Sequence, residues 1–509
     1  MKDRAETQPL PGLSFRSKLS SMNILITTFS VYSLLILFIT VAAFRHTRTH
    51  ADYILGNRSF NAMITAMGVA ASDMSAWLMQ GVPATIYMMG LGKSWLLVSI
   101  LIGGYLNWLI VAPRLRMYTE VASNSLTLPA YFENRFAMKA GYLRYIAALF
   151  FVIFFTVYAT SGFVGAAKLL VTAADMDYID ALWISGPLII AYCVVGGYFA
   201  VNWIDLFQGT LMLLALVIVP AAAIFGYQGG FEGIMTQITM IAPEKMSFFN
   251  IALDISFFTS IAWGLGYFGQ PHILVRFMSA RDEKAIKYGR RICTAWMVIA
   301  LSSAVITGFV GIAYFPLGSL PTPEAVLPAL VKSLLNPWAA GMILAAIISA
   351  IISTLAAVLM AAGSALINDL YKYRLRPKAS QTELVWVGRL CVLVIAVCAF
   401  FMADHENPSV MMLVSHAWGG LGATFGPVVL VSLFYRNMTA TGALFGMLFG
   451  AITALVWAVL GHTVGGIFEL YELLPGFIMG MVGALWGCRF SHPNHKSLEL
   501  FDLMKERLQ

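Results

Sequence analysis

The chain has 509 residues, of which 59% are hydrophobic and 11% charged, and its formal net charge is +7. This composition excludes a single water-soluble core and predicts an all-α polytopic membrane protein. The positive charge does not indicate a nucleic-acid partner, because the basic residues lie in short segments between apolar stretches, where membrane topology and lipid headgroups account for them.

Apolar stretches of about twenty residues, each long enough to cross a bilayer as a helix, predict about thirteen spans. We expect residues 1–22 to be a tail, 23–44 to be the first helix, and 489–509 to be a second tail. The spans begin near Asn23, Phe60, Ser94, Gly141, Ala181, Leu206, Asn250, Ile292, Trp338, Gly388, Val410, Gly442 and Leu473.

Lysine and arginine gather in alternate segments between the spans, and segments of this kind lie in the cytoplasm. An odd number of spans then predicts an N-terminal tail outside the membrane and a C-terminal tail in the cytoplasm. The basic segments hold Arg45, Arg48 and Arg58 after the first span, Arg114, Arg116, Arg135 and Lys139 after the third, and six Lys or Arg between Arg276 and Arg291.

Asp73 is the only charged residue of an otherwise apolar stretch from Phe60 to Met89. A charge at that depth costs several kcal/mol, so an intramembrane carboxylate indicates an ion or substrate site. The sequence shows none of the HExxH, GxSxG or strand-linked GxGxxG motifs and no CxxC pair. These patterns favour a transporter driven by an ion gradient over an enzyme.

Two spans are predicted to be broken in the membrane. The second holds Asp73 between two serines and later Gly81 and Pro83, and the seventh is rich in glycine from Trp263 to Pro271. Broken helices leave carbonyl oxygens that a monovalent cation can bind. The ninth span adds the hydroxyls of Ser353-Thr354, although hydroxyls within a helix usually bond back to their own backbone.

Several of these runs resemble those of bacterial members of the sodium:solute symporter family, and the similarity extends in register from about residue 23 to residue 487. The matching runs are Asp52 to Gly56 with Arg58, Ser72 to Ser75, Leu126 to Pro129, Trp263 to Leu274, Ser353-Thr354, and Gly419 to Pro427.

The resemblance implies a LeuT-like fold of five-plus-five inverted repeats in which helices 2 and 7 are broken. By this likeness, the first repeat covers 60–226 and the second covers 250–435. The helix at 23–44 and two helices within 442–488 are additions to the ten-helix core.

The resemblance also implies sodium-coupled uptake of L-proline by alternating access, with Na+ as the coupling ion. Asp73 would lie near the sodium site, and Arg58 and Asp205 would lie on the cytoplasmic side, either in a gate or in surface pairs. The implied sodium ligands are the carbonyls of Ala71, Met74 and Ala350 and the hydroxyls of Ser353 and Thr354. The implied substrate residues are Ser75, Ala76, Trp77, Tyr158, Trp263, Tyr267 and Pro271.

Ala76 departs from the family, which has glycine there, and its methyl group is expected to project toward the substrate. The alternatives are therefore a sodium-coupled symporter for another small amino acid or an organic acid, or a membrane sensor or channel. We expect a monomer in the bacterial inner membrane whose partners are the substrate, sodium and the lipid bilayer.

Overall fold

The computed structural model describes residues 27–28, 31–32, 34–35, 38, 55, 58–138, 141–195, 198–248, 254–404 and 408–508. The predicted N-terminal tail, 1–22, lies outside these residues, and only scattered helical positions of the predicted helix at 23–44 lie within them. The described part of the chain is helical apart from one isolated β-bridge, Phe60 with Ala280.

The first half contains two spans with internal changes of helix type. Its elements are α3 (Ala62–Asp73), the π-helix η2 (Trp77–Gly81), α4 (Val82–Met89), the 3₁₀-helix η3 (Leu91–Ser94), α5 (Trp95–Leu106), the π-helix η4 (Asn107–Val111), α6 (Ala112–Val121), α7 (Leu128–Arg135), α8 (Tyr142–Ala174), α9 (Tyr178–Val195) and α10 (Tyr198–Gly226).

The second half begins with α11 and ends with a helix that follows the last apolar stretch. Its elements are α11 (Gly230–Ile241), η5 (Pro243–Met246), α12 (Ile255–Ala262), η6 (Trp263–Gly269), α13 (Pro271–Ser279), α14 (Glu283–Tyr314), η7 (Pro323–Ala325), α15 (Val326–Leu334), α16 (Pro337–Ala365), η8 (Leu366–Leu375), α17 (Gln381–Ala403), α18 (Val410–Phe434), α19 (Ala440–Thr463), η9 (Gly466–Glu469), α20 (Leu473–Gly487), η10 (Cys488–Phe490) and α21 (His495–Arg507).

Within the described residues, nine helices are long and apolar enough to cross a membrane, or up to ten if the bent pair α3 and α4 counts as one span. The predicted number of thirteen therefore stays a prediction. Both broken spans begin at a side-chain cap: Asn61 accepts from the Ile64 N–H and Asp254 from the Phe257 N–H. Such caps satisfy backbone donors that the first helical turn leaves open.

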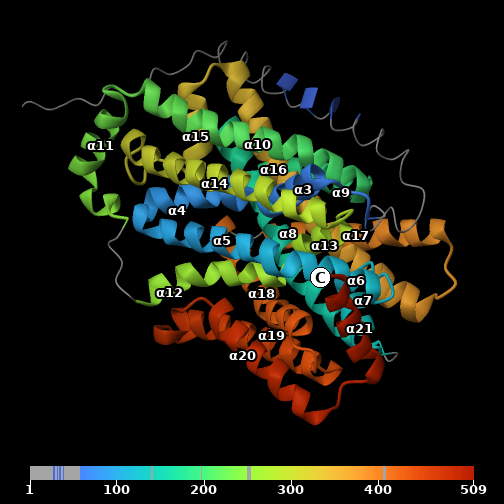
Figure 1. The fold of residues 1–509 in the computed structure, drawn as a ribbon. Coiled ribbons are helices and arrows are strands. Elements are labelled where there is room, and N and C mark those ends of the chain that lie inside the picture. Colours follow the sequence, from blue (N-terminus) through green and yellow to red (C-terminus); the bar gives the residue numbers. More distant parts are fainter. Residues whose placement is uncertain are drawn as a thin grey trace, which may run out of the picture.

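The broken parts of both spans lie inside the bundle. Helix α3 packs against α10, α14 and α16, while η6 packs between α5 and α18. Helices α19 and α20 form a pair along one side of the molecule, next to α18, and α21 lies against α6 and α7 (Figure 1).

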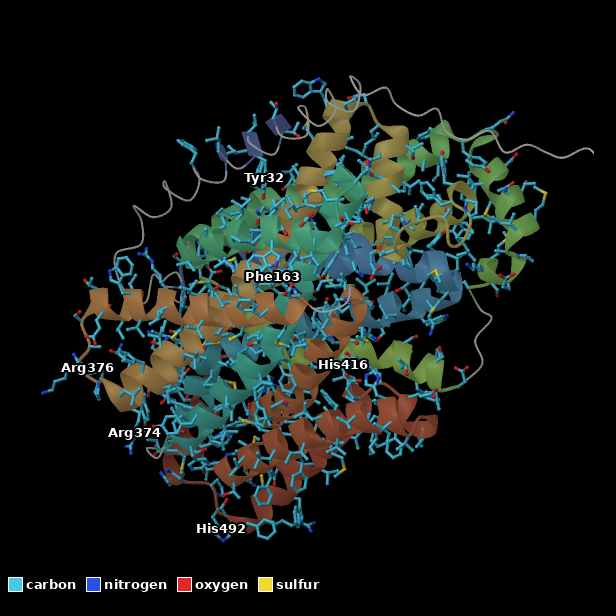
Figure 2. The ribbon with its side chains drawn as sticks, turned by 180° about the vertical axis from the view of Figure 1, so that it is seen from behind. Tyr32, Phe163, Arg374, Arg376, His416 and His492 are labelled. Atoms are coloured by element: carbon cyan, nitrogen blue, oxygen red, sulfur yellow. The ribbon has the colours of Figure 1, made fainter. Side chains whose placement is uncertain are left out.

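One end of the bundle is rich in arginine, and we call it the basic end (Arg58, Arg116, Arg374 and Arg376). Thr127, the N-cap of α7, donates a hydrogen bond to Asp369, which brings the start of α7 next to η8. Figure 2 shows Arg374 and Arg376 at the edge of the molecule, well away from His416.

The prediction that the basic residues lie in loops is wrong for several of them. Arg116 lies within α6, Arg135 within α7 and Arg276 within α13, and all three are buried. Backbone carbonyls accept from these guanidinium groups: Arg116 donates to Ala280, and Arg135 donates to Ser432. An arginine offers five N–H donors, so a buried arginine can bond to backbone carbonyls of several neighbouring helix ends.

Candidate functional site

The second span opens at Asp73, as the sequence predicts. Helix α3 ends there, Met74 has an extended backbone (φ −84°, ψ 91°), and the chain re-enters a helix at Trp77. The two parts of the span are bent by 60°. Because the extended residue interrupts the helical ladder, carbonyls of the last turn of α3 are left for other partners.

Two hydroxyl groups of α16 face one of these carbonyls. Ser353 Oγ lies 3.1 Å and Thr354 Oγ1 lies 3.2 Å from the Ala71 carbonyl oxygen. Met74 and Ala350 are fully buried in the same packed region, where α3 contacts α16. Neither hydroxyl bonds back to its own helix in the contacts described, which distinguishes them from ordinary helical serines and threonines.

Asp205 of α10 adds a carboxylate to this cluster. Its Oδ1 lies 2.6 Å from Ser353 Oγ, and its Oδ2 pairs with Arg276 at 2.9 Å. A serine hydroxyl has one proton, so Ser353 cannot donate to Ala71 and to Asp205 at the same time. The two hydroxyls thus offer two protons to two acceptor oxygens and keep lone pairs of their own, and an oxygen-lined site of this composition suits a hard cation.

The Asp73 side chain points toward the seventh span. Tyr267 donates to Asp73 Oδ2 at 2.5 Å, while Trp77 Nε1 donates to the Asp73 carbonyl at 2.8 Å and the Tyr158 hydroxyl does so at 3.4 Å. All four residues are buried. Asp73 thus joins three aromatic side chains from three helical segments at the break.

The seventh span changes helix type at the predicted place. Helix α12 ends at Ala262, the 3₁₀-helix η6 follows, and Gln270 is extended before Pro271 begins α13. Side-chain donors cover the carbonyls of η6: Trp418 bonds to Trp263 at 3.0 Å, Gln270 to Gly266 at 3.2 Å and Asn107 to Tyr267 at 2.9 Å.

A tryptophan of α18 fits directly against the seventh span. A Cβ atom built on Gly266 would lie 1.8 Å from Trp418 Nε1, so only glycine permits this approach. The Trp418 ring also meets Tyr267 edge to face, with 5.1 Å between ring centroids. Trp263 and Tyr267 are therefore held in one unit by Trp418.

The model of the sodium:solute symporter family matches residues 53–450, which is most of the chain. The chain belongs to the sodium:solute symporter family. Among curated proteins, the sodium/proline symporter of Salmonella typhimurium is 43% identical over 465 residues, which are 90% of this chain and 91% of that protein. The sodium/proline symporter of Escherichia coli is also 43% identical over 465 residues, with the same coverage.

Among solved structures, this symporter resembles a Na+-coupled sialic acid symporter in a substrate-bound outward-open state. The TM-score is 0.74 at 19% identity, covering 91% of this chain and 98% of that one. A likeness at this identity concerns the fold alone. Together with the two broken spans, it confirms the predicted fold class.

The structure gathers most of the predicted site residues of this symporter into two neighbouring groups. One is the oxygen cluster around Ala71. The other is the aromatic group on Asp73, which consists of Trp77, Tyr158 and Tyr267. Ser75 and Pro271 are buried and lie within a few residues of this group in the sequence. Trp263 lies apart from Trp77 and Tyr158 in the contacts described and joins the second group through Trp418.

The methyl group of Ala76 packs against a neighbouring helix. A Cβ atom built on Gly165 of α8 would lie 2.7 Å from the Ala76 Cβ, so the methyl group occupies space that Gly165 leaves free. This contact favours a packing role for the methyl group, and the expectation that it projects toward the substrate stays a prediction. A glycine on the facing helix accommodates the larger side chain.

Arg58 and Asp205 have different surroundings. Arg58 adopts φ 53° and donates to Asn124, to the Ser125 carbonyl and to the Met278 carbonyl, which ties the start of the second span to the end of α13. Asp205 is fully buried beside Ser353, so the alternative of a surface pair does not hold for it.

Sequence reasoning missed Arg276 and Trp418. The charge pattern places Arg276 in the basic run that follows it, although the uncharged residues 277–280 separate the two. That gap and the isolated carboxylate of Asp205 were the available signals. Nothing local marks Trp418, because its role arises from a contact with a segment far away in the sequence.

Proposed function

We propose that this family member couples the entry of sodium to the uptake of L-proline by alternating access. The observation that carries the proposal is the surroundings of the Ala71 carbonyl. The break in the second span leaves this carbonyl facing the hydroxyls of Ser353 and Thr354. The Ser353 hydroxyl also contacts the buried carboxylate of Asp205. Relatives that are 43% identical over 90% of the chain are named sodium/proline symporters, which supports both the ion and the substrate.

The proposed sodium ligands are the carbonyls of Ala71, Met74 and Ala350 and the hydroxyls of Ser353 and Thr354. A bound sodium would take lone pairs from both hydroxyls, and Ser353 would then give its proton to Asp205 alone. Asp73 contributes negative charge from the neighbouring turn. Its short contact with Tyr267 means that it orders the break and does not need to ligate the ion.

The proposed substrate site is the aromatic group on Asp73. A pyrrolidine ring is apolar and its imino group is cationic, so it suits the faces of tyrosine and tryptophan rings. Backbone N–H groups at the start of a half-helix suit its carboxylate. The residues assigned to this site are Ser75, Ala76, Trp77, Tyr158, Trp263, Tyr267 and Pro271, with Ala76 acting through its backbone.

The contact between Asp73 and Tyr267 offers a route for coupling. Asp73 lies two residues from Ala71, so an ion that fixes the end of α3 also fixes the carboxylate that holds Tyr267. Sodium would in this way favour the arrangement of the aromatic group that binds proline, which is a shift between pre-existing states.

One sodium per proline is energetically sufficient. The proline zwitterion is neutral, so each cycle moves one positive charge, worth about 2.3 kcal/mol per 100 mV. A tenfold sodium gradient adds about 1.4 kcal/mol, and together they support roughly 500-fold accumulation.

We place the protein in the bacterial inner membrane with its basic end in the cytoplasm, its N-terminus outside and its C-terminus inside. The exposed Arg374 and Arg376 and the arginines near Met278 and Ala280 support this orientation. The repeats are proposed to cover 60–226 and 250–435.

Uptake of radiolabelled proline into liposomes that contain the purified protein tests the proposal, with inward gradients of sodium, potassium or protons. We expect accumulation with sodium alone, and competition by unlabelled proline. Sodium-driven uptake of another amino acid or an organic acid would keep the mechanism and replace the substrate. Lack of uptake under every gradient would contradict the transport function.

A further inference from the structure

The segment between α19 and α20, which lies beyond the second proposed repeat, reaches the broken seventh span. Tyr471 is 5% exposed, and its ring stacks on Trp263 with 5.1 Å between ring centroids and 27° between ring planes. A residue near the C-terminal end of the fold thus touches a proposed substrate residue directly.

Three helices hold Tyr471 in place. Its hydroxyl donates to the Ser415 carbonyl of α18 at 2.7 Å, and its N–H donates to Thr259 Oγ1 of α12 at 3.1 Å. From α19, Trp457 Nε1 donates to the carbonyl of Leu470, the preceding residue, at 2.9 Å. The ring is therefore fixed by groups that do not belong to the proposed site.

The next residue and a glycine on α18 add to this support. Glu472 Oε1 lies 2.7 Å from Nδ1 of His416, which Figure 2 labels. A Cβ atom built on Gly419 would lie 3.1 Å from Cε2 of Tyr471, so the glycine makes room for the ring. The segment carrying Tyr471 and Glu472 is thus a rigid support packed on α18.

Trp263 is consequently held in two ways. Trp418 fixes its backbone through the carbonyl, whereas Tyr471 covers one face of its indole. An aromatic ring on one face restricts the rotamers through which the indole could swing away. Restraint of this kind lowers the entropy that a side chain loses when it closes on a ligand.

We propose that Tyr471 is a positioning residue for the substrate site, acting through Trp263. It sets the affinity for proline by holding the indole ready, although it does not touch the substrate. The proposal rests on the proposed function, because it assumes that Trp263 contacts proline. It assigns the helix pair α19 and α20 a part in recognition.

The test compares Tyr471→Ala and Tyr471→Phe in liposomes at saturating sodium. Loss of an aromatic pair should raise the KM for proline roughly threefold to tenfold, with the maximal rate per folded transporter unchanged. Tyr471→Phe keeps the ring and should stay close to the parent protein. Phe468→Ala is the matched control, because Phe468 lies in the same segment and packs on Trp457 instead of Trp263.

A double-mutant cycle with Trp263→Ala separates positioning from general stability. If Tyr471 acts through the indole, Tyr471→Ala should change the KM little once Trp263 is alanine, whereas a purely structural role would give the same change in both backgrounds. Equal shifts in both backgrounds, or an equal shift for Phe468→Ala, would overturn the proposal. Failure of the parent protein to take up proline would instead contradict the proposed function.

Discussion

The second and seventh spans are both interrupted, but they are opened in different ways. The second is opened at one extended residue, Met74, and hydroxyls from α16 face its Ala71 carbonyl. The seventh forms a 3₁₀-helix before its own extended residue, Gln270, and the partners of the 3₁₀ carbonyls are indole and amide N–H groups.

This difference in partners separates the two proposed roles. A hydroxyl can turn its proton elsewhere and offer a lone pair, so it can bind a cation beside the carbonyl it faces. The indole and amide N–H groups that face the seventh span are donors only, so they offer no lone pair beside the carbonyls they bind. The second span is therefore suited to sodium, while the seventh is a fixed frame that presents aromatic rings.

The largest effect is expected from removal of the hydroxyls at the second span. Ser353→Ala together with Thr354→Ala should raise the sodium concentration for half-maximal uptake roughly tenfold to a hundredfold, since hydrogen bonds and contacts to a charged group are worth about 1.5–3 kcal/mol. The KM for proline at saturating sodium should change far less. Thr307→Ala is the control, because this buried hydroxyl bonds only within its own helix in the contacts described. An unchanged sodium requirement would show that the ion binds elsewhere.

Replacing Asp73 by asparagine tests the contact between Asp73 of the second span and Tyr267 of the seventh. Asparagine can still accept from Tyr267, so the geometry is kept while the charge is lost. We expect the sodium requirement to rise about tenfold, as for one lost charge interaction of ordinary strength. Circular dichroism should show an unchanged helix content. Sodium dependence equal to that of the parent protein would exclude Asp73 from the coupling.

Substitution in the seventh span should weaken proline binding more than sodium binding. Trp263→Ala removes an aromatic face that a cationic imino group can use, and the affinity for proline should fall roughly threefold to tenfold. Sodium binding measured without proline should stay close to that of the parent protein. A larger loss for sodium than for proline would mean that the division between the two spans is wrong.

Local sequence was enough to predict the two breaks, because a lone carboxylate and a run of glycines both conflict with an undisturbed membrane helix. The resemblance to a family then supplied the pairing of Ala71 with Ser353 and Thr354. Sequence did not reveal Trp418, Tyr471 or the position of Arg276. These depend on contacts between segments far apart in the chain, which leave no periodic pattern in either segment.

The direction of a single methyl group also lay beyond sequence reasoning. By the resemblance, Ala76 stands where the family is expected to have glycine, but whether its Cβ faces the substrate or a neighbouring helix depends on the packing of α8. The structure places it against Gly165, and Gln80 Oε1 would lie 3.0 Å from a Cβ atom at that glycine. The methyl group of Ala76 on the second span thus fills the space that Gly165 leaves on α8.

The smallest effect is therefore expected from Ala76→Gly. If the methyl lay in the pocket, its removal would be worth about 1–3 kcal/mol of discrimination and would re-rank competing amino acids. Because it lies against α8, we expect the competitor ranking in uptake assays to stay the same, with a stability loss of about 1 kcal/mol for glycine in a helical segment.

Gly165→Ala should be far more harmful than Ala76→Gly, since its new methyl would collide with that of Ala76. Combining Gly165→Ala with Ala76→Gly moves the methyl group to the other helix and should restore much of the lost uptake. Restoration would identify the pair as packing partners, which leaves substrate choice to the aromatic group on Asp73. If Ala76→Gly alone changed the order in which amino acids compete with proline, the Ala76 methyl would face the substrate. That result would weaken the assignment of substrate recognition to the seventh span.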